Sequence, residues 1–529
     1  MNDKTYQVKL RWLILVSTIV RCIIANLLEL GNDEVYYYTY AQQLDWNHFD
    51  HPPLIGIFIR FFTLNLNWVN DFTMRLGPIV LAAFNTWCIA TITKQIATPK
   101  AGYIVAILYC SSFYASIISG ILILPDSFAN SFWLLAMYSM VTLIKSKERN
   151  QINNHLLLLG CWIGLASLCK VHALVLAVGF VVFAFFHRKD FFRNIYFYAG
   201  IVICLILISP ILFWNIQHEW INYHFHGERV NLSFQGLRLD FFLQSILGQF
   251  FYNNPFLIIL YAIALFQVVK YKCFKNPFNT QFLILTWYCT LPLLIYITFI
   301  SLIKQTLPHW TGSLFFFYMI ITATWAERQI DLGKTKFVRI ILNNVMPFTL
   351  IMTISLLLII RFYPGNVTGT KEQLKLGNED ISLEMIGWRK FGEEFKIWRD
   401  EQIESGHMKP TDPILVHKWF PAGHIGFYIS RPLGIRMIAE GKLKDLHKYA
   451  WMNLLEEPIQ IDEDAYYISP SNIYTDPNVI YPGLFKEIRL IKTFEQTRSH
   501  VLVRRWYIYQ LISSNEELGN KKPWQYHNN

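Results

Sequence analysis

Residues 10–53 read LRWLILVSTIVRCIIANLLELGNDEVYYYTYAQQLDWNHFDHPP. The first part of this stretch is a run of about 20 mainly apolar residues, which is the length that an α-helix needs to cross the hydrocarbon core of a bilayer. The second part is rich in Asp, Tyr, Trp and His, and Asp33 and Glu34 come directly after the apolar run. No small-residue cleavage site separates the two parts, so we expect a retained membrane helix followed by an exposed loop.

Similar apolar runs recur through the first two thirds of the chain. They predict a polytopic α-helical membrane protein with about 11 transmembrane helices. The composition agrees, because only 16% of the residues are charged, against about 25% in a soluble protein. The expected spans are 11–30, 74–93, 101–119, 127–144, 153–169, 172–187, 195–213, 255–270, 281–300, 310–327 and 338–361.

The distribution of basic residues predicts the orientation of these helices. If the N-terminus is cytoplasmic, the loops on that side carry eighteen Lys and Arg and the opposite loops carry six. This bias follows the positive-inside rule. The same clustering explains the formal net charge of +10 without nucleic acid, for which we see no basic stripe interleaved with aromatic residues.

The chain divides into two expected domains. Residues 1–361 form a transmembrane catalytic domain whose first outer loop covers 31–73, and residues 362–529 form a soluble α/β domain outside the cytoplasm. The soluble part shows a helical pattern followed by β-rich runs. We expect an interfacial segment at 241–254, a helix at 381–403, and strands within 413–420, 425–430, 465–470 and 499–512.

Asp33 and Glu34 are the first candidates for chemistry. A carboxylate just outside a membrane can act as general base toward an acceptor hydroxyl or amine, and the aromatic, His-rich run beyond it suits a carbohydrate. The alternative is an N-cap pair at the start of a helix. Asp126, in Leu124-Pro125-Asp126, leaves the same two interpretations open.

The first outer loop also resembles a known family. DEVYYYTYAQQLDWNHFDHPPLIGIFIR (33–60) is similar to that loop in the bacterial protein O-mannosyltransferase-like and aminoarabinose-transferase-like enzymes. These are polyprenyl-phosphate-sugar-dependent glycosyltransferases of the GT-C superfamily. Further matching segments, in the family's order, are Arg75–Pro78, Leu124–Asp126, Gly164–Lys170, Pro210–Asn215, Pro308–Trp310 and Ile386–Trp388.

The resemblance implies a role for each matching residue. Asp33 would be the catalytic base, Glu34 would shape its pocket, and Asp126 would be a second catalytic acidic residue. A lipid-phosphate leaving group needs cations, which neutralise its developing charge, although basic side chains at helix ends also snorkel to headgroups. The residues expected to bind substrate are His51, Arg75, Lys170, Lys304, His309 and Trp310.

The function implied is an inverting transfer of a sugar from a polyprenyl-phosphate donor to an extracytoplasmic acceptor, in a cell inner (plasma) membrane. Two alternatives stay open: a lipid-linked sugar flippase or transporter, and a glycan polymerase or ligase that uses a lipid diphosphate. We expect no metal cofactor, since the histidines show no zinc-ligand spacing. A divalent ion is the less favoured alternative, and no nucleic-acid partner is expected.

Overall fold

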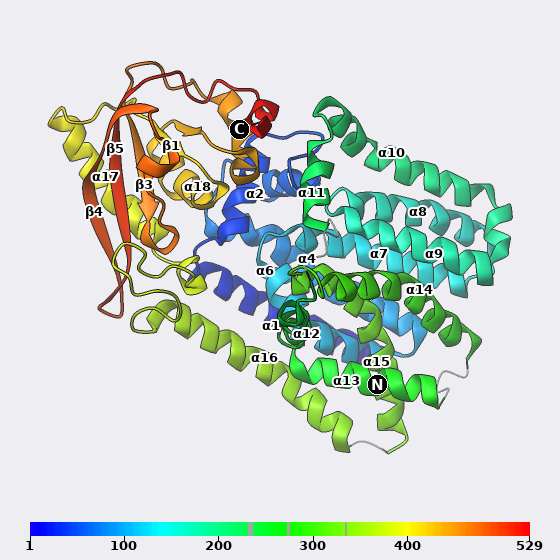
Figure 1. Ribbon diagram of the computed structural model, residues 1–529. Helices are drawn as coiled ribbons and strands as arrows, with labels where there is room; N and C mark the ends of the chain where they lie inside the picture. Colours follow the sequence, from blue (N-terminus) through cyan, green and yellow to red (C-terminus); the bar gives the residue numbers. More distant parts are fainter. Residues whose placement is uncertain (231–235, 272–275, 334–335, 529) are drawn as a thin grey trace.

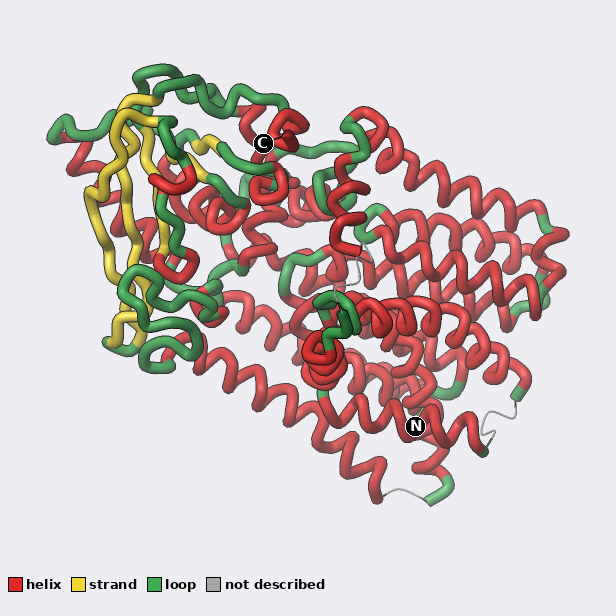
Figure 2. The backbone as a smooth tube through the Cα atoms, in the orientation of Figure 1, coloured by secondary structure: helices red, strands yellow, loops and turns green. Residues whose placement is uncertain are grey.

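A computed structural model describes residues 1–230, 236–271, 276–333 and 336–528 of this protein. A helical bundle forms one end of the molecule, and a domain built on a small sheet forms the other (Figures 1 and 2). Lys272, Lys275 and Lys334, which we counted on the expected cytoplasmic side, lie outside the described residues.

The bundle consists of long helices joined by short turns. Its elements are α1 (Asp3–Leu27), α4 (Asp71–Ile96), α5 (Pro99–Ser111), η1 (Tyr114–Ile118), α6 (Ser119–Ile121), α7 (Pro125–Lys145), α8 (Arg149–Ser167), η2 (Val171–Ala173), α9 (Leu174–His187), η3 (Lys189–Arg193), α10 (Ile195–Gln217), α11 (Ile221–Val230), α12 (Leu239–Asn253), α13 (Pro255–Lys270), α14 (Pro277–Ile300), η4 (Pro308–Leu314), α15 (Phe315–Asp331) and α16 (Lys336–Phe362). The core lies around α7, whose apolar stretch is 83% buried, whereas that of α16 is only 17% buried.

The expected count of about eleven spans is not confirmed. Among the described residues, five helices are long and apolar enough to cross a membrane, and the number rises to eight if each of three bent helix pairs is one span. The bends measure 91° between α1 and the next helix, 76° after α5, and 99° between α12 and α13. Other expected spans are short: α9 has 14 residues, or about 21 Å of helix, against a core of about 30 Å.

The first outer loop folds into two helices of its own, α2 (Asn32–Gln42) and α3 (Leu54–Phe62). α2 is buried along most of its length, so it forms part of the protein core rather than an exposed strap. Gly56 of α3 makes this packing possible, because a Cβ there would lie 2.6 Å from the carbonyl oxygen of Tyr40. The loop is therefore a rigid platform at the end of the bundle.

The second domain contains a five-stranded mixed sheet in the order β2-β1-β3-β5-β4. β1 runs parallel to β2 and β3, and β5 runs antiparallel to β3 and β4. α17 covers one face, where the Phe391 ring stacks on Trp506 of β5 at 4.0 Å. The elements are η5 (Ile381–Leu383), α17 (Trp388–Glu404), β1 (Ile414–Val416), α18 (Trp419–Ile425), η6 (Gly426–Ser430), α19 (Arg431–Leu433), β2 (Met437–Ala439), α20 (Leu443–Leu446), α21 (Tyr449–Met452), η7 (Asn453–Leu455), β3 (Ala465–Pro470), η8 (Ser471–Ile473), α22 (Pro477–Ile480), β4 (Phe485–Arg498), β5 (Val501–Ser514) and η9 (Pro523–Asn528).

One predicted strand is wrong, and two strands, β2 and β4, were missed. The run 425–430 is helical, because α18 and η6 pack against α2 of the other domain. Gly423 touches α2 so closely that a Cβ would lie 2.8 Å from Val35, and such tertiary contacts override local β-propensity. β4 was missed because it is a charged edge strand, and charge is how natural sheets protect an edge.

α18 and η6 also fix the connection between the two domains. The backbone N–H of Leu30 donates to the Tyr428 hydroxyl at 2.7 Å, and a ring nitrogen of His424 lies 3.0 Å from the Leu30 carbonyl oxygen. Leu30 lies between α1 and α2. The sheet domain therefore holds the short connection that leads into Asp33 and Glu34.

Candidate functional site

The two acidic residues at the start of α2 face different surroundings. Gly31 is the N-cap, so Asp33 and Glu34 both lie in the first helical turn and neither is itself the cap. Carboxylates are favourable there because the N-terminal end of a helix carries partial positive charge. The Asp33 side chain is exposed, whereas Glu34 is only 2% exposed. Asp33 is therefore the accessible carboxylate of the pair.

Glu34 forms a buried ion pair with Arg75 of α4. Its two oxygens accept from Nε and Nη2 of Arg75 at 2.8 and 2.5 Å. They also accept from the backbone N–H groups of Gly31 and Ile123. Every lone-pair direction of a carboxylate can be used in this way, so Glu34 acts as a structural acceptor here.

The N–H donors of Arg75 are also all used in hydrogen bonds. Its other N–H groups donate to the carbonyl oxygens of Ala25, Leu28 and Glu29 at 2.7–3.0 Å. These carbonyls belong to the end of α1 and the residues after it, where a helix has no partners of its own. With five donors used by five acceptors, the guanidinium holds the 91° turn between α1 and α2 and has no N–H left for a phosphate.

Asp126 anchors a second buried cluster at the start of α7. Its Oδ2 accepts from Nζ of Lys170 at 2.7 Å, and its Oδ1 accepts from the Tyr114 hydroxyl at 2.9 Å. Leu124 is the N-cap, so the N-cap interpretation of Asp126 is wrong by two positions. Lys170 comes from the turn between α8 and η2 and is 13% exposed. It therefore has one ion-pair partner and a partly open ammonium group.

His309 and His172 lie close enough to Asp126 to interact electrostatically with it. His309 comes from η4, which Gln249 of α12 ties down through a 3.0 Å hydrogen bond to the Pro308 carbonyl oxygen. Burial lowers the pKa of His309 to about 4, and the Lys170 ammonium acts in the same direction. The imidazole is therefore neutral at pH 7, able to hydrogen-bond but not to supply charge.

Tyr37 connects the two acidic clusters. Its hydroxyl lies within electrostatic reach of Asp33, Asp50 and Asp126, and its ring lies 5.7 Å from that of His51. Asp33, Asp50 and Asp126 thus all act on one tyrosine, and Lys170 and His309 join the arrangement through their interactions with Asp126. The sequence contained a signal for Tyr37, since positions i and i+4 share one helix face.

Glu384 is a second carboxylate that interacts with Asp33, and no sequence pattern predicted it. Its side chain is hydrogen-bonded to that of Asn32, and burial raises its pKa to about 7, with the Asp33 carboxylate acting in the same direction. The backbone pairs nearby, because the N–H of Glu29 donates to the Met385 carbonyl oxygen at 3.1 Å. The sheet domain therefore contributes an acidic group to the edge of the site.

Asp50 stabilises α2 through hydrogen bonds with two of its tyrosines. Its buried carboxylate accepts from the hydroxyls of Tyr36 (2.6 Å) and Tyr40, and its Oδ2 lies 4.0 Å from Nε2 of His51. Lys304 follows the end of α14, and Trp310 follows His309 in η4.

The side chains of this arrangement are of the types that acid–base chemistry and phosphate binding use. The arrangement places an exposed carboxylate, a buried Asp–Lys pair and several tyrosine hydroxyls at one end of a bundle. Among residues 1–230, 236–271, 276–333 and 336–528, no three His, Cys, Asp or Glu side chains lie together as a metal-binding group. The substrate-binding roles of His51, Lys304, His309 and Trp310 stay predictions.

Comparison with known proteins shows what this chain is similar to. Residues 50–214 match the Dolichyl-phosphate-mannose-protein mannosyltransferase family, and this region contains Arg75, Asp126 and Lys170. The resemblance drawn from the sequence is therefore confirmed. Over this region the chain is similar to the protein O-mannosyltransferase type of GT-C membrane glycosyltransferase.

Two solved structures share the fold over nearly the whole chain. ArnT from Cupriavidus metallidurans in the apo state is 11% identical, with a TM-score of 0.62, and ArnT bound to undecaprenyl phosphate is 11% identical, with a TM-score of 0.64. Each alignment covers 97% of this chain and 99% of the other. Among curated protein sequences, none matches the chain significantly.

Proposed function

We propose that this protein transfers a sugar from a polyprenyl-phosphate donor to an acceptor on the extracytoplasmic side, with inversion at the anomeric carbon. The observation that carries the proposal is that Tyr37 interacts electrostatically with both Asp33 and Asp126, and that Asp126 is paired with Lys170. An exposed carboxylate can accept the proton of an acceptor hydroxyl or amine. The lysine that is paired with Asp126 can stabilise the phosphate that departs.

Each residue has a distinct role in the proposed reaction. Asp33 removes the acceptor proton as the acceptor oxygen or nitrogen attacks the anomeric carbon. The bond between that carbon and the phosphate oxygen breaks, and its electron pair leaves with the lipid phosphate. Lys170 neutralises this phosphate, while Asp126 holds the lysine in place. Lys304 is the second cation proposed for the phosphate, in place of Arg75.

The membrane setting and the lipid bound to a structural neighbour support the donor class. ArnT has been solved with undecaprenyl phosphate, and a polyprenyl phosphate would enter the present site from the bilayer. We propose a plasma (inner) membrane location with the N-terminus in the cytoplasm, which places Asp33 and residues 363–529 outside. Labelling of Asp33→Cys with an impermeant thiol reagent in intact cells tests this orientation, and protection of that position until lysis would contradict it.

Transfer assays on the purified full-length protein test the chemistry. Asp33→Asn keeps the shape of the side chain and removes the base, so we expect transfer from a polyprenyl-monophosphate sugar to fall at least about 100-fold. The matched control is Glu372→Gln, at an exposed position in the tail, with normal transfer. Normal transfer by Asp33→Asn would remove Asp33 from the mechanism.

Two further measurements separate the alternatives. A lipid-diphosphate donor used in preference to the monophosphate would favour a polymerase or ligase, and lipid movement without any glycosidic product would favour a flippase.

We also propose that transfer needs no metal ion, because Lys170 supplies the positive charge at the leaving group. A chelator then leaves the rate unchanged, and restoration of a lost rate by a divalent ion would contradict this part of the proposal.

A further inference from the structure

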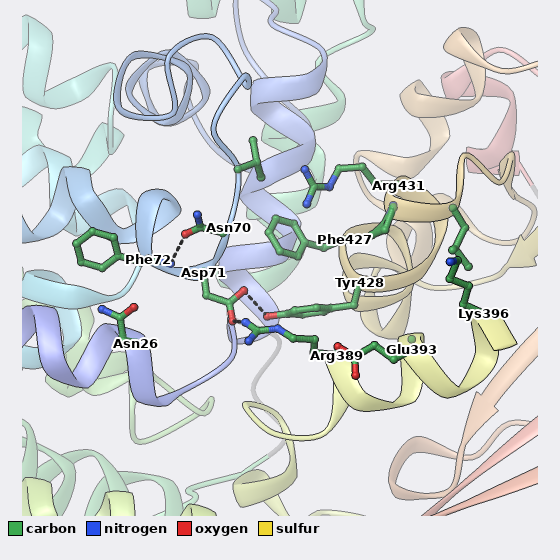
Figure 3. Close-up of a pocket in the computed structure, with 14 residues that line it drawn as sticks. Asn26, Asn70, Asp71, Phe72, Arg389, Glu393, Lys396, Phe427, Tyr428 and Arg431 are labelled. Carbon is green, nitrogen blue, oxygen red and sulfur yellow. Dashed lines mark hydrogen bonds and ion pairs between the residues drawn. The ribbon is translucent and has the colours of Figure 1, made fainter.

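A pocket of about 570 Å³ lies between the bundle and the sheet domain, separate from the residues around Tyr37 (Figure 3). Its bundle side is formed by the end of α1, at Asn26, and the start of α4, at Asn70–Phe72. Its other side is formed by the first turns of α17 and by the end of η6 with α19. The pocket therefore opens at the junction of the two domains.

The pocket carries a net positive charge. Arg389, Lys396 and Arg431 supply three cations, and Asp71 and Glu393 supply two carboxylates. Asp71 is already neutralised, since it pairs with Arg389 and accepts from the Tyr428 hydroxyl at 3.0 Å, as Figure 3 shows. This leaves Lys396 and Arg431 against Glu393, which is a surplus of one positive charge.

Lys396 and Arg431, the two cations that are not paired with Asp71, are accessible to a ligand. Lys396 is exposed on α17. Arg431 is exposed as well, and its guanidinium lies 4.8 Å from the centre of the Phe427 ring. The guanidinium is also hydrogen-bonded to the Tyr38 side chain, and because Arg has five N–H donors, others can still donate to an anion. One anionic group with an apolar attachment fits this lining, since Phe72 and Phe427 supply the apolar part.

The position of the pocket relative to the bilayer indicates the source of such an anion. α1 presents apolar side chains outward next to Asn26 of the pocket, because Ile23 is 54% exposed and Leu27 is 38% exposed, and Val80 of α4 is 45% exposed. Trp68, before the start of α4, is 50% exposed, and tryptophan is typical of the membrane–water interface. The pocket thus lies at the headgroup level of the bilayer that the bundle spans.

We propose that this pocket binds the phosphate of an anionic membrane lipid. A phosphodiester carries one negative charge, which equals the surplus of the pocket. Its acyl chains would lie along the outward apolar faces of α1 and α4. The wall of the pocket is also joined to the candidate site, because Tyr428 contacts both Asp71 and the backbone N–H of Leu30. This inference does not depend on the proposed function.

Lipid binding to the full-length protein in detergent tests the proposal, with phosphatidylglycerol as the probe and phosphatidylcholine as the zwitterionic comparison. A basic residue near an anionic headgroup is worth about 1 kcal/mol, or about fivefold in affinity. We therefore expect Lys396→Gln to weaken phosphatidylglycerol binding about fivefold, and Lys396→Gln with Arg431→Gln to weaken it about thirtyfold. The matched control is Lys390→Gln, on the same helix but outside the pocket lining, with an effect within about twofold.

Each outcome decides the matter. Equal binding of phosphatidylglycerol by the double variant and the wild type would overturn the proposal, and so would an equal loss in Lys390→Gln, which would indicate general surface charge. Inorganic phosphate at millimolar concentration is expected to leave the lipid bound, because it has no acyl chains. If it displaced the lipid completely, the pocket would be a site for free phosphate and not for a lipid. The single variant Lys396→Gln keeps the test valid if the double variant is unstable.

Discussion

The buried pair of Glu34 and Arg75 allows the sharpest test of the structure. Glu34→Gln replaces one acceptor oxygen by an NH₂ group, which cannot accept from the Arg75 guanidinium or a backbone N–H. The guanidinium then remains buried with its charge uncompensated. Removing one partner of a buried ion pair costs about 3–5 kcal/mol, so we expect Glu34→Gln to lower the free energy of unfolding by about this amount.

A double-mutant cycle of Glu34 and Arg75 should therefore show a large coupling energy. In Glu34→Gln with Arg75→Gln neither residue is charged, so the penalty of the orphaned charge disappears. We expect the double variant to be more stable than the sum of the single variants predicts, with a coupling of about 2 kcal/mol or more. The measurement is denaturant unfolding of the purified protein in detergent, followed by tryptophan fluorescence.

A matched control comes from an exposed pair in the sheet domain. Lys390 and Glu394 are one helical turn apart at 3.6 Å, and exposed pairs of this kind contribute about 0.3–0.5 kcal/mol. Glu394→Gln should therefore change the stability by less than about 0.5 kcal/mol. If Glu34→Gln behaved like this control, or if the cycle were additive, the assignment of Glu34 as the counter-ion that holds the α1–α2 turn would be refuted.

Three more predictions concern other parts of the molecule. Lys170→Met should reduce transfer at least about 100-fold, and adding Asp126→Asn should restore stability but not transfer, as thermal unfolding and transfer assays would show; recovered transfer would contradict the role of Lys170. The pKa of Glu384 is raised to about 7 by burial, so its carboxyl binds a proton more tightly in the folded state and stability falls as the pH rises from its ordinary pKa of about 4.5 to 7. Glu384→Gln should remove this part of the pH dependence of the thermal midpoint, and an unchanged profile would be inconsistent with it. Gly160→Leu should separate α8 from α10, because a Cβ at Gly160 would overlap a backbone carbonyl of α10, whereas Gly227→Ala meets nothing within 4 Å; equal thermal midpoints would contradict this packing.

The sequence predicted the broad organisation because hydrophobicity is a local property. An apolar run long enough to cross a bilayer is visible without knowledge of its neighbours, and so is the change to a β-rich pattern after residue 362. The strand at 465–470 is confirmed as β3, and the run 499–512 is confirmed as β5 at 501–514. The number of spans was not confirmed, since bends such as the one between α12 and α13 depend on packing rather than on composition.

The candidate site was predictable only where the residues are close in sequence or carried by the family resemblance. Asp33, Asp126 and Lys170 were identified in this way. Glu384 was not, because it reaches Asp33 only through the docking of the sheet domain on α2. Arg75 was expected at a phosphate, but no local pattern reveals that its five donors are used by the turn between two helices.

By itself the sequence determined that the chain enters a membrane, that its polar aromatic loop follows the first helix, and that Asp33 begins that loop. These features follow from the order of apolar and polar residues, which chain folding cannot change. Only the tertiary structure decided that Glu34 forms a buried ion pair with Arg75 while Asp33 stays exposed. The two carboxylates are adjacent in the chain and equal in chemistry, and they differ because successive helical residues point about 100° apart, one into the bundle and one out of it.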